Sequence, residues 1–270
     1  MKLTKSHLFL LICLLLIWAC NGKGDRQKSN NESPISSISA DSAELLFNKY
    51  VNEPLNDFPS RAIYEKGKVY PVDEASLDSS FFLFRARLLE IIAQKDIIRF
   101  LPLVDKNIKA DFGGEDGKPG FIKIWDLNSQ EKINASALWP TLDGILRKGG
   151  TFSKNRQFFT APYTYSNFPE SGDMFSQSII AGAGVRMRAE PNLKGAMLKK
   201  LSHDIVEFKA LTSLEETIGG ETHPWIHIAT EDGMDGYVWG KFVVSPLGFR
   251  AGFEKQDSGD WKMVFLVAGD

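Results

Sequence analysis

Both cysteines of this 270-residue chain, Cys13 and Cys20, lie close to its amino terminus. The rest of the chain therefore has no thiol with which to form an internal disulfide or a thiolate zinc cluster. Its fold has to be held by burial of apolar side chains, and hydrophobic residues make up 43% of the sequence, a typical globular share. The formal net charge of -2 gives no overall attraction to nucleic acid or to an anionic membrane.

The amino terminus has the pattern of a secretory signal peptide. Lys2 and Lys5 precede any acidic residue, and an apolar run from Leu8 to Ala19 follows them. This run is shorter than the roughly 20 apolar residues that a membrane-spanning helix needs. A basic start, a short apolar core and small residues near its end are typical of an exported chain.

The end of this segment resembles the lipobox of bacterial lipoproteins. Ile17 stands three positions before Cys20, and the small residue Ala19 stands just before it. The resemblance implies that residues 1–19 are removed and that the sulfur of Cys20 carries lipid, which would anchor the chain to a bacterial membrane. An ordinary signal peptide with an incidental cysteine is the alternative. Asn21, in a position where an inner-membrane retention signal would more typically have aspartate, favours the outer membrane.

Composition divides the remaining chain into four segments. Residues 20–40 are rich in Ser, Asn and Gly with almost no large apolar group, so we expect a flexible tether. Residues 41–177 mix helical and strand patterns and predict an α+β domain. Residues 178–245 predict a small all-β domain of short strands separated by Gly, Pro and Asp turns. Residues 246–270 predict a β-hairpin whose turn is Asp257–Asp260.

A long helix is predicted over residues 77–95 of the α+β segment. Its apolar stripe comprises Phe81, Phe84, Leu88, Ile91 and Ile92. Arg85, Glu90 and Gln94 are expected to face away from the core. Other predicted elements are helices from Asp41, after an Asp96 cap, and over 121–127 and 137–147, with strands over 68–70, 107–112 and 157–166.

Residues 184–243 resemble the bacterial Src-homology-3 domain, a small β-barrel of exported envelope proteins. Four pieces match in order: Val185–Arg188 with Glu190-Pro191, residues 192–208, Pro224–Ile228, and residues 233–239 with Phe242-Val243. Two positions depart from the family pattern. Arg186 replaces the usual asparagine, and Tyr237 replaces the second tryptophan.

The resemblance implies that this segment binds cell-wall peptidoglycan, often through its peptide stem, or a protein partner in the envelope. Aromatic side chains beside polar loops are the candidate ligand contacts, namely Trp225, Tyr237, Trp239 and His223. The alternative is that these rings fill the interior of a small barrel, which needs its large aromatic side chains inside.

The hairpin at the carboxyl end has a different pattern from the segment before it. Residues 264–267 are apolar at every position, so both faces of this strand are expected to be covered. A small barrel cannot cover both faces of an appended strand. We therefore expect the hairpin to pack against the α+β domain and to join the two domains.

The sequence predicts no catalytic, metal-binding or cofactor-binding residues. His223 and His227 have the spacing of a ligand pair on a helix, but Pro224 and the strand context place them about 13 Å apart. Paired carboxylates within residues 41–177 stay open, because two acids distant in sequence leave no pattern. The prediction is a non-catalytic envelope lipoprotein that binds peptidoglycan peptide or an envelope protein. The alternative is a cell-wall hydrolase that uses such a pair, with the barrel as its targeting module.

Overall fold

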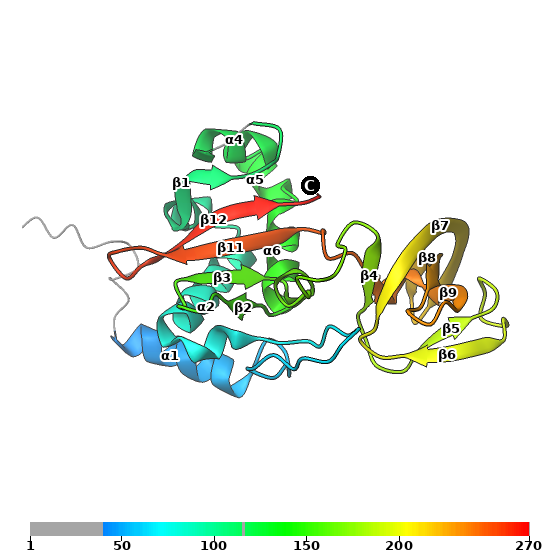
Figure 1. Cartoon of the computed structure of the whole chain (residues 1–270). Helices are drawn as coiled ribbons and strands as arrows, with labels where there is room; N and C mark the ends of the chain where they lie inside the picture. The colour runs from blue at the N-terminus through cyan, green and yellow to red at the C-terminus, as the bar shows by residue number, and fades with distance from the viewer. Residues whose placement is uncertain (1–39, 115–116, 270) are drawn as a thin grey trace, which may run out of the picture. The chain divides into compact units, whose positions relative to one another are not determined.

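The computed structural model of the chain describes residues 40–114 and 117–269. The predicted signal peptide, Cys20 and the predicted tether lie outside these described residues. None of the helices that are described is long and apolar enough to cross a membrane. The helices and two β-sheets together make a mixed α+β fold (Figure 1).

The first sheet is mixed and has the strand order β1-β12-β11-β3-β2. β1 runs parallel to β12, and the other neighbours are antiparallel. We call this sheet and its helices the mixed-sheet unit. Its strands are β1 (Val104–Lys109), β2 (Thr151–Phe152), β3 (Phe158–Ala161), β11 (Arg250–Lys255) and β12 (Trp261–Val267).

The carboxyl-terminal hairpin therefore lies inside the mixed sheet. β11 pairs with β3, and β12 pairs with β1, so both its strands are flanked by strands from earlier in the chain. The amide of Gln256 donates to the carbonyl of Asp260 at 2.7 Å, which closes the turn. The prediction that the hairpin packs against the earlier α+β segment is confirmed.

Short caps and loops connect the helices of the mixed-sheet unit. Asp78 caps α2 by accepting from the amides of Ser80 and Phe81, and Asp96 caps α3 as predicted. The helices are α1 (Ala40–Asn52), η1 (Glu74–Leu77), α2 (Ser79–Gln94), α3 (Ile97–Phe100), η2 (Leu101–Leu103), α4 (Gly117–Ile124), α5 (Gln130–Ala135), α6 (Leu138–Arg147) and α7 (Tyr163–Ser166).

An aromatic cluster around Phe81 holds this unit together. Phe81 is fully buried, and five rings from α2 and four strands surround it. The ring centroids lie 4.2 Å from Phe159, 4.8 Å from Trp261, 5.4 Å from Phe152, 5.7 Å from Phe253 and 5.8 Å from Phe84. The predicted apolar stripe of α2 is buried in full.

The orientation predicted for one side chain of α2 was wrong. Arg85 is buried, with a side chain that is 5% exposed, and its Nη1 lies 2.7 Å from Oδ1 of Asp73. Helical periodicity could not show this, because the carboxylate partner lies in the segment before the helix. Glu90 is half-buried and pairs with Lys49 of α1, whereas Gln94 is exposed as expected.

Several predicted element boundaries also differ from the structure. The strand over 68–70 is a single bridge between Lys68 and Asp204, and β1 begins three residues before the predicted strand. The strand over 157–166 ends at Ala161 and gives way to α7. α4 begins at Gly117 and carries Pro119 in its first turn, where proline is tolerated but hides the helix signal.

The second sheet is antiparallel throughout, with the order β10-β4-β7-β8-β9-β5-β6. It curls into a half-barrel (Figure 1), which we call the curled-sheet unit. The strands at its two ends, β10 and β6, are not neighbours, so the sheet is open where a closed barrel was predicted. Its strands are β4 (Gln177–Ile180), β5 (Val185–Arg188), β6 (Met197–Leu201), β7 (Ile205–Ile218), β8 (Glu221–Ala229), β9 (Asp235–Trp239) and β10 (Val243–Val244), with the short helix η3 (Gly240–Phe242) before β10.

The two units meet along the segment that precedes η1. The amide of Val69 donates to the carbonyl of His203 at 2.8 Å, and the amide of Ile205 donates to the carbonyl of Gly67 at 2.8 Å. A small apolar cluster with members from both units lies beside these bonds. Its buried residues are Val69, Val72, Tyr163, Phe168 and Ile179.

We predict that Phe253→Ala lowers the free energy of unfolding by about 3–5 kcal/mol, because it leaves a cavity beside Phe81 and Phe84. Urea denaturation followed by circular dichroism measures this change. The matched control is Phe175→Ala, whose ring is 72% exposed and whose loss should change stability by about 0.5 kcal/mol or less. Equal effects of the two substitutions would show that the hairpin does not complete this core.

Candidate ligand-binding site

Strands β8 and β9 present two different faces. Ile226, Ile228 and Val238 belong to the apolar core of the curled sheet. Trp225 pairs with Trp239 across the two strands, and the next pair on that same face is His227 with Tyr237. Because side chains alternate along a strand, these four rings lie on the face opposite the core.

A hollow of about 560 Å³ opens beside the two tryptophans. Its floor is aromatic, since Trp225, Trp239 and Phe242 all line it, and the rings of Trp239 and Phe242 lie 5.8 Å apart. Charged side chains from β5, β8 and η3 line it as well. They are Arg186, Arg188, Glu221 and Lys241.

The two arginines reach the hollow because successive side chains of β5 lie on opposite faces of the sheet. Val185 and Met187 are in the core of the curled sheet, so Arg186 and Arg188 lie on the other face. Nη1 of Arg188 donates to the carbonyl of Gly195 at 2.8 Å, which fixes its side chain. Arg186 is exposed and has no ion-pair or hydrogen-bond partner within the described chain. Its guanidinium is therefore free to bind an anionic group.

An ion pair at the hollow links β8 to η3. Nζ of Lys241 lies 2.6 Å from Oε1 of Glu221 and 5.9 Å from the ring centroid of Trp239. Nε2 of His223 lies 3.3 Å from the other oxygen of Glu221. The hydrogen bond from Lys241, followed by that from His223, lowers the pKa of Glu221 below its ordinary value. Cations outnumber anions around the hollow, so it favours a negatively charged ligand.

The two indole N–H groups differ in how they are satisfied. Nε1 of Trp239 donates to the carbonyl of Glu216 at 3.0 Å. Trp225 is 2% exposed, and its Nε1 is enclosed without a hydrogen-bond partner among the described residues. A buried donor without a partner is uncommon in folded proteins, because the lost hydrogen bond to water is not replaced. Trp225 thus lines the hollow with an indole N–H that has no partner among the described residues.

The structure brings three of the four predicted site residues together. Trp225 and Trp239 line the hollow, and the ring of His223 lies edge-on to Trp239 with centroids 4.9 Å apart. Tyr237 lies on the same face of the sheet but outside the hollow, stacked on His227 at 4.9 Å. Trp225 and Trp239 are both buried, although neither belongs to the apolar core cluster of the curled sheet.

Sequence reasoning did not find the charged residues of the hollow. The alternation of apolar and basic residues in Val185–Arg188 was a usable signal, since it places both arginines on one face of a strand. Nothing local in the sequence connects Lys241 with Glu221, which lies twenty residues earlier. Among the described residues, no group of three or more His, Cys, Asp or Glu side chains could hold a metal ion.

Comparisons with known proteins add no relative: no family model, no curated protein and no solved structure matches the chain.

We predict that Lys241→Gln raises the pKa of Glu221 toward its ordinary value, because the strongest hydrogen bond to the carboxylate is lost. A carboxyl carbon NMR titration measures this pKa directly. Because folding lowers this pKa, the pair stabilises the fold above the unfolded pKa and stops doing so as pH falls through the folded pKa. Lys194→Gln, an exposed lysine outside the hollow, is the control and should leave the Glu221 titration unchanged.

Proposed function

We propose that the chain is a non-catalytic lipoprotein of the bacterial envelope, and that its curled-sheet unit is a Src-homology-3-like module that binds cell-wall peptide. The observation that carries the proposal is the hollow, in which an aromatic floor meets Arg186, Arg188 and Lys241. Aromatic floors bind the flat and aliphatic parts of an extended peptide, and cations bind its carboxylates. Stem peptides of peptidoglycan are short and carry such carboxylates.

The order of motifs along the curled sheet supports the same family. The matched pieces Val185–Arg188, Pro224–Ile228 and residues 233–239 coincide with β5, β8 and β9. η3 follows β9 directly, so the chain turns before β10, the last strand of the curled sheet. Arg186 replaces the family's asparagine in the wall of the hollow, which gives this module more positive charge than the family pattern has.

The anchor is the second part of the proposal. Ile17, Ala19 and Cys20 support cleavage and lipidation, and Asn21 supports delivery to the outer membrane. The alternative, a cell-wall hydrolase with paired carboxylates, requires a carboxyl group whose pKa is raised, so that it can act as the acid. In the described part of the chain, the pKa shifts resolved for carboxyl groups are all downward.

We predict that the full chain sediments with purified peptidoglycan and that Arg186→Glu weakens this retention by about tenfold or more. The reversal replaces an attractive contact with a repulsive one, and binding should also weaken at high salt. Lys154→Glu makes the same change of sign on an exposed lysine of the mixed-sheet unit and should bind like the unaltered chain. No retention of the unaltered chain, or equal retention of both variants, would refute wall binding through this hollow.

We predict that Cys20→Ala moves the chain from the membrane fraction to the soluble fraction of cells. The reason is that acyl chains contribute about 0.8 kcal/mol per buried CH₂ and no other part of the mature chain is expected to hold it to lipid. Mass spectrometry of the unaltered chain should show acyl groups on its amino-terminal residue. Cys13→Ala is the matched control, because this residue belongs to the predicted signal peptide. A Cys20→Ala variant that has lost residues 1–19 and still stays membrane-bound would contradict the anchor.

A further inference from the structure

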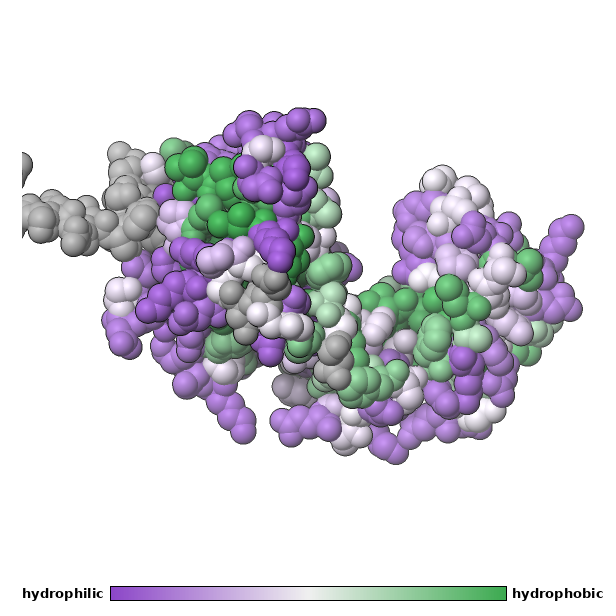
Figure 2. Space-filling model, turned by 90° about the horizontal axis from the view of Figure 1, so that it is seen from above, coloured by the Kyte–Doolittle hydropathy of each residue, from purple (hydrophilic) through white to green (hydrophobic). Residues whose placement is uncertain are grey.

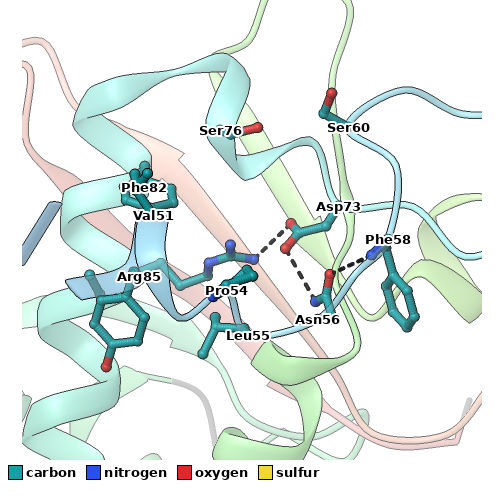
Figure 3. A pocket seen from close by; sticks show the side chains of 12 residues that line it. Val51, Pro54, Leu55, Asn56, Phe58, Ser60, Asp73, Ser76, Phe82 and Arg85 are labelled. Carbon is teal, nitrogen blue, oxygen red and sulfur yellow. Dashed lines mark hydrogen bonds and ion pairs between the residues drawn. The ribbon is translucent and has the colours of Figure 1, made fainter. Parts of the chain in front are cut away.

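A second hollow opens in the mixed-sheet unit, over the buried Arg85–Asp73 ion pair. Its volume is about 220 Å³, and its walls come from the end of α1, the loop before η1, and α2. Val51, Pro54, Leu55 and Phe82 make the walls largely apolar. Figure 3 shows the guanidinium of Arg85 directed at Asp73, with Asn56 on the other side of that carboxylate.

The carboxylate of Asp73 is already supplied with donors from the chain. Its Oδ1 accepts from Nη1 of Arg85 at 2.7 Å and from the amide of Ala75 at 3.3 Å. Its Oδ2 accepts from Nδ2 of Asn56 at 3.3 Å. Asn56 is itself held, because it also donates to the carbonyl of Arg147 at 3.0 Å and accepts from the amide of Phe58 at 3.2 Å. These groups position Arg85 and have little capacity left for a ligand.

Arg85, in contrast, keeps unused donors. A guanidinium carries five N–H groups, and Nη1 is the one nitrogen of Arg85 that donates to another described residue. Within the described residues, Nε and Nη2 of Arg85 make no hydrogen bond. Arg85 lines the hollow, and its side chain is 5% exposed. The polar end of the hollow therefore offers N–H donors on a fixed cation.

The chemistry of these walls defines the ligand. A planar guanidinium fork matches a carboxylate, which accepts two parallel hydrogen bonds. One cation and one anion line the hollow, so a single negative charge is accommodated better than the double charge of a phosphate. The apolar walls favour a short aliphatic body.

We propose that this hollow binds a small aliphatic monocarboxylate, whose carboxylate lies on the free N–H groups of Arg85. The same chemistry is offered by a free short-chain acid and by the carboxyl terminus of a peptide that ends in an aliphatic residue. The site is separate from the tryptophan hollow of the curled sheet, and neither proposal depends on the other.

Calorimetric titration of the full chain in non-ionic detergent tests this site with isocaproate and its neutral analogue isocaproamide. We expect saturable binding of isocaproate and binding of the amide weaker by about 10- to 100-fold, because the charge-assisted hydrogen bonds are lost. The dipeptide Gly-Leu and its carboxyl-amidated form make the second arm. If Gly-Leu binds more tightly than isocaproate, the natural ligand is a peptide terminus, and if it binds less tightly, the ligand is a free acid.

Two substitutions separate binding from folding. Arg85→Met should abolish isocaproate binding, although it also leaves Asp73 without its cation. Val51→Trp fills the hollow from the exposed side of α1 without touching the ion pair and should abolish binding in a folded chain. Leu45→Trp, on the same helix but outside the hollow, should bind like the unaltered chain. Equal binding of acid and amide, no binding of either carboxylate, or unaltered binding in Val51→Trp would overturn the proposal.

Discussion

The packing of the carboxyl-terminal hairpin around Phe81 is the contact on which the rest of the structure depends. Phe81 comes from the first long helix, whereas Phe253 and Trp261 come from the last strands of the chain. The Trp261 indole also donates to Oγ of Ser80 at 3.0 Å, which fixes the ring against the start of α2. β12 and β11 lie between β1 and β3, so the mixed sheet is not continuous until both strands are in place. Its folding therefore requires contacts between residues more than 170 positions apart.

Because β11 and β12 complete the mixed sheet, the curled-sheet unit is an insertion within the sequence of the mixed-sheet unit. The chain leaves the mixed sheet after β3, forms the curled sheet from β4 to β10, and returns at β11. Buried Arg250 fixes the return, because its guanidinium donates to the carbonyls of Leu247, Gly248 and Gly269 and lies 4.8 Å from the ring centroid of Tyr165. The tryptophan hollow is thus carried by a unit tied to the mixed sheet at both ends.

Much of this organisation could be predicted from the sequence, and the exceptions have physical causes. The apolar stripe of α2 and the Asp96 cap each reflect local periodicity or capping, which a sequence carries directly. In the strand predicted to be covered on both faces, Leu266 and Val267 are buried, whereas Val264 and Phe265 are half-buried. The inward turn of Arg85 depends on Asp73, and the start of α4 depends on a glycine–proline segment that locally disfavours helix. Such features are decided by distant partners or by packing.

The candidate site shows the same division. Its aromatic residues were predicted as ligand contacts from a resemblance to a known family, and the structure pairs Trp225 with Trp239 across β8 and β9. The face of the sheet on which these rings lie depends on the register between β8 and β9, and this register could not be read from the sequence. The basic residues came together only in the structure, since β5 and η3 line the same hollow but are more than fifty residues apart in sequence.

The most direct test of the central claim is the indole N–H resonance of Trp225 during titration with a soluble, uncrosslinked stem peptide of peptidoglycan. Trp225 lines the hollow, and its N–H has no partner among the described residues, so a ligand that binds there should change the surroundings of the ring and shift this resonance saturably. The indole of Trp261, which donates to Ser80 in the mixed sheet, should not move. A Trp225 resonance that stays unchanged at saturating peptide, or that moves together with Trp261, would contradict recognition of cell-wall peptide by this hollow.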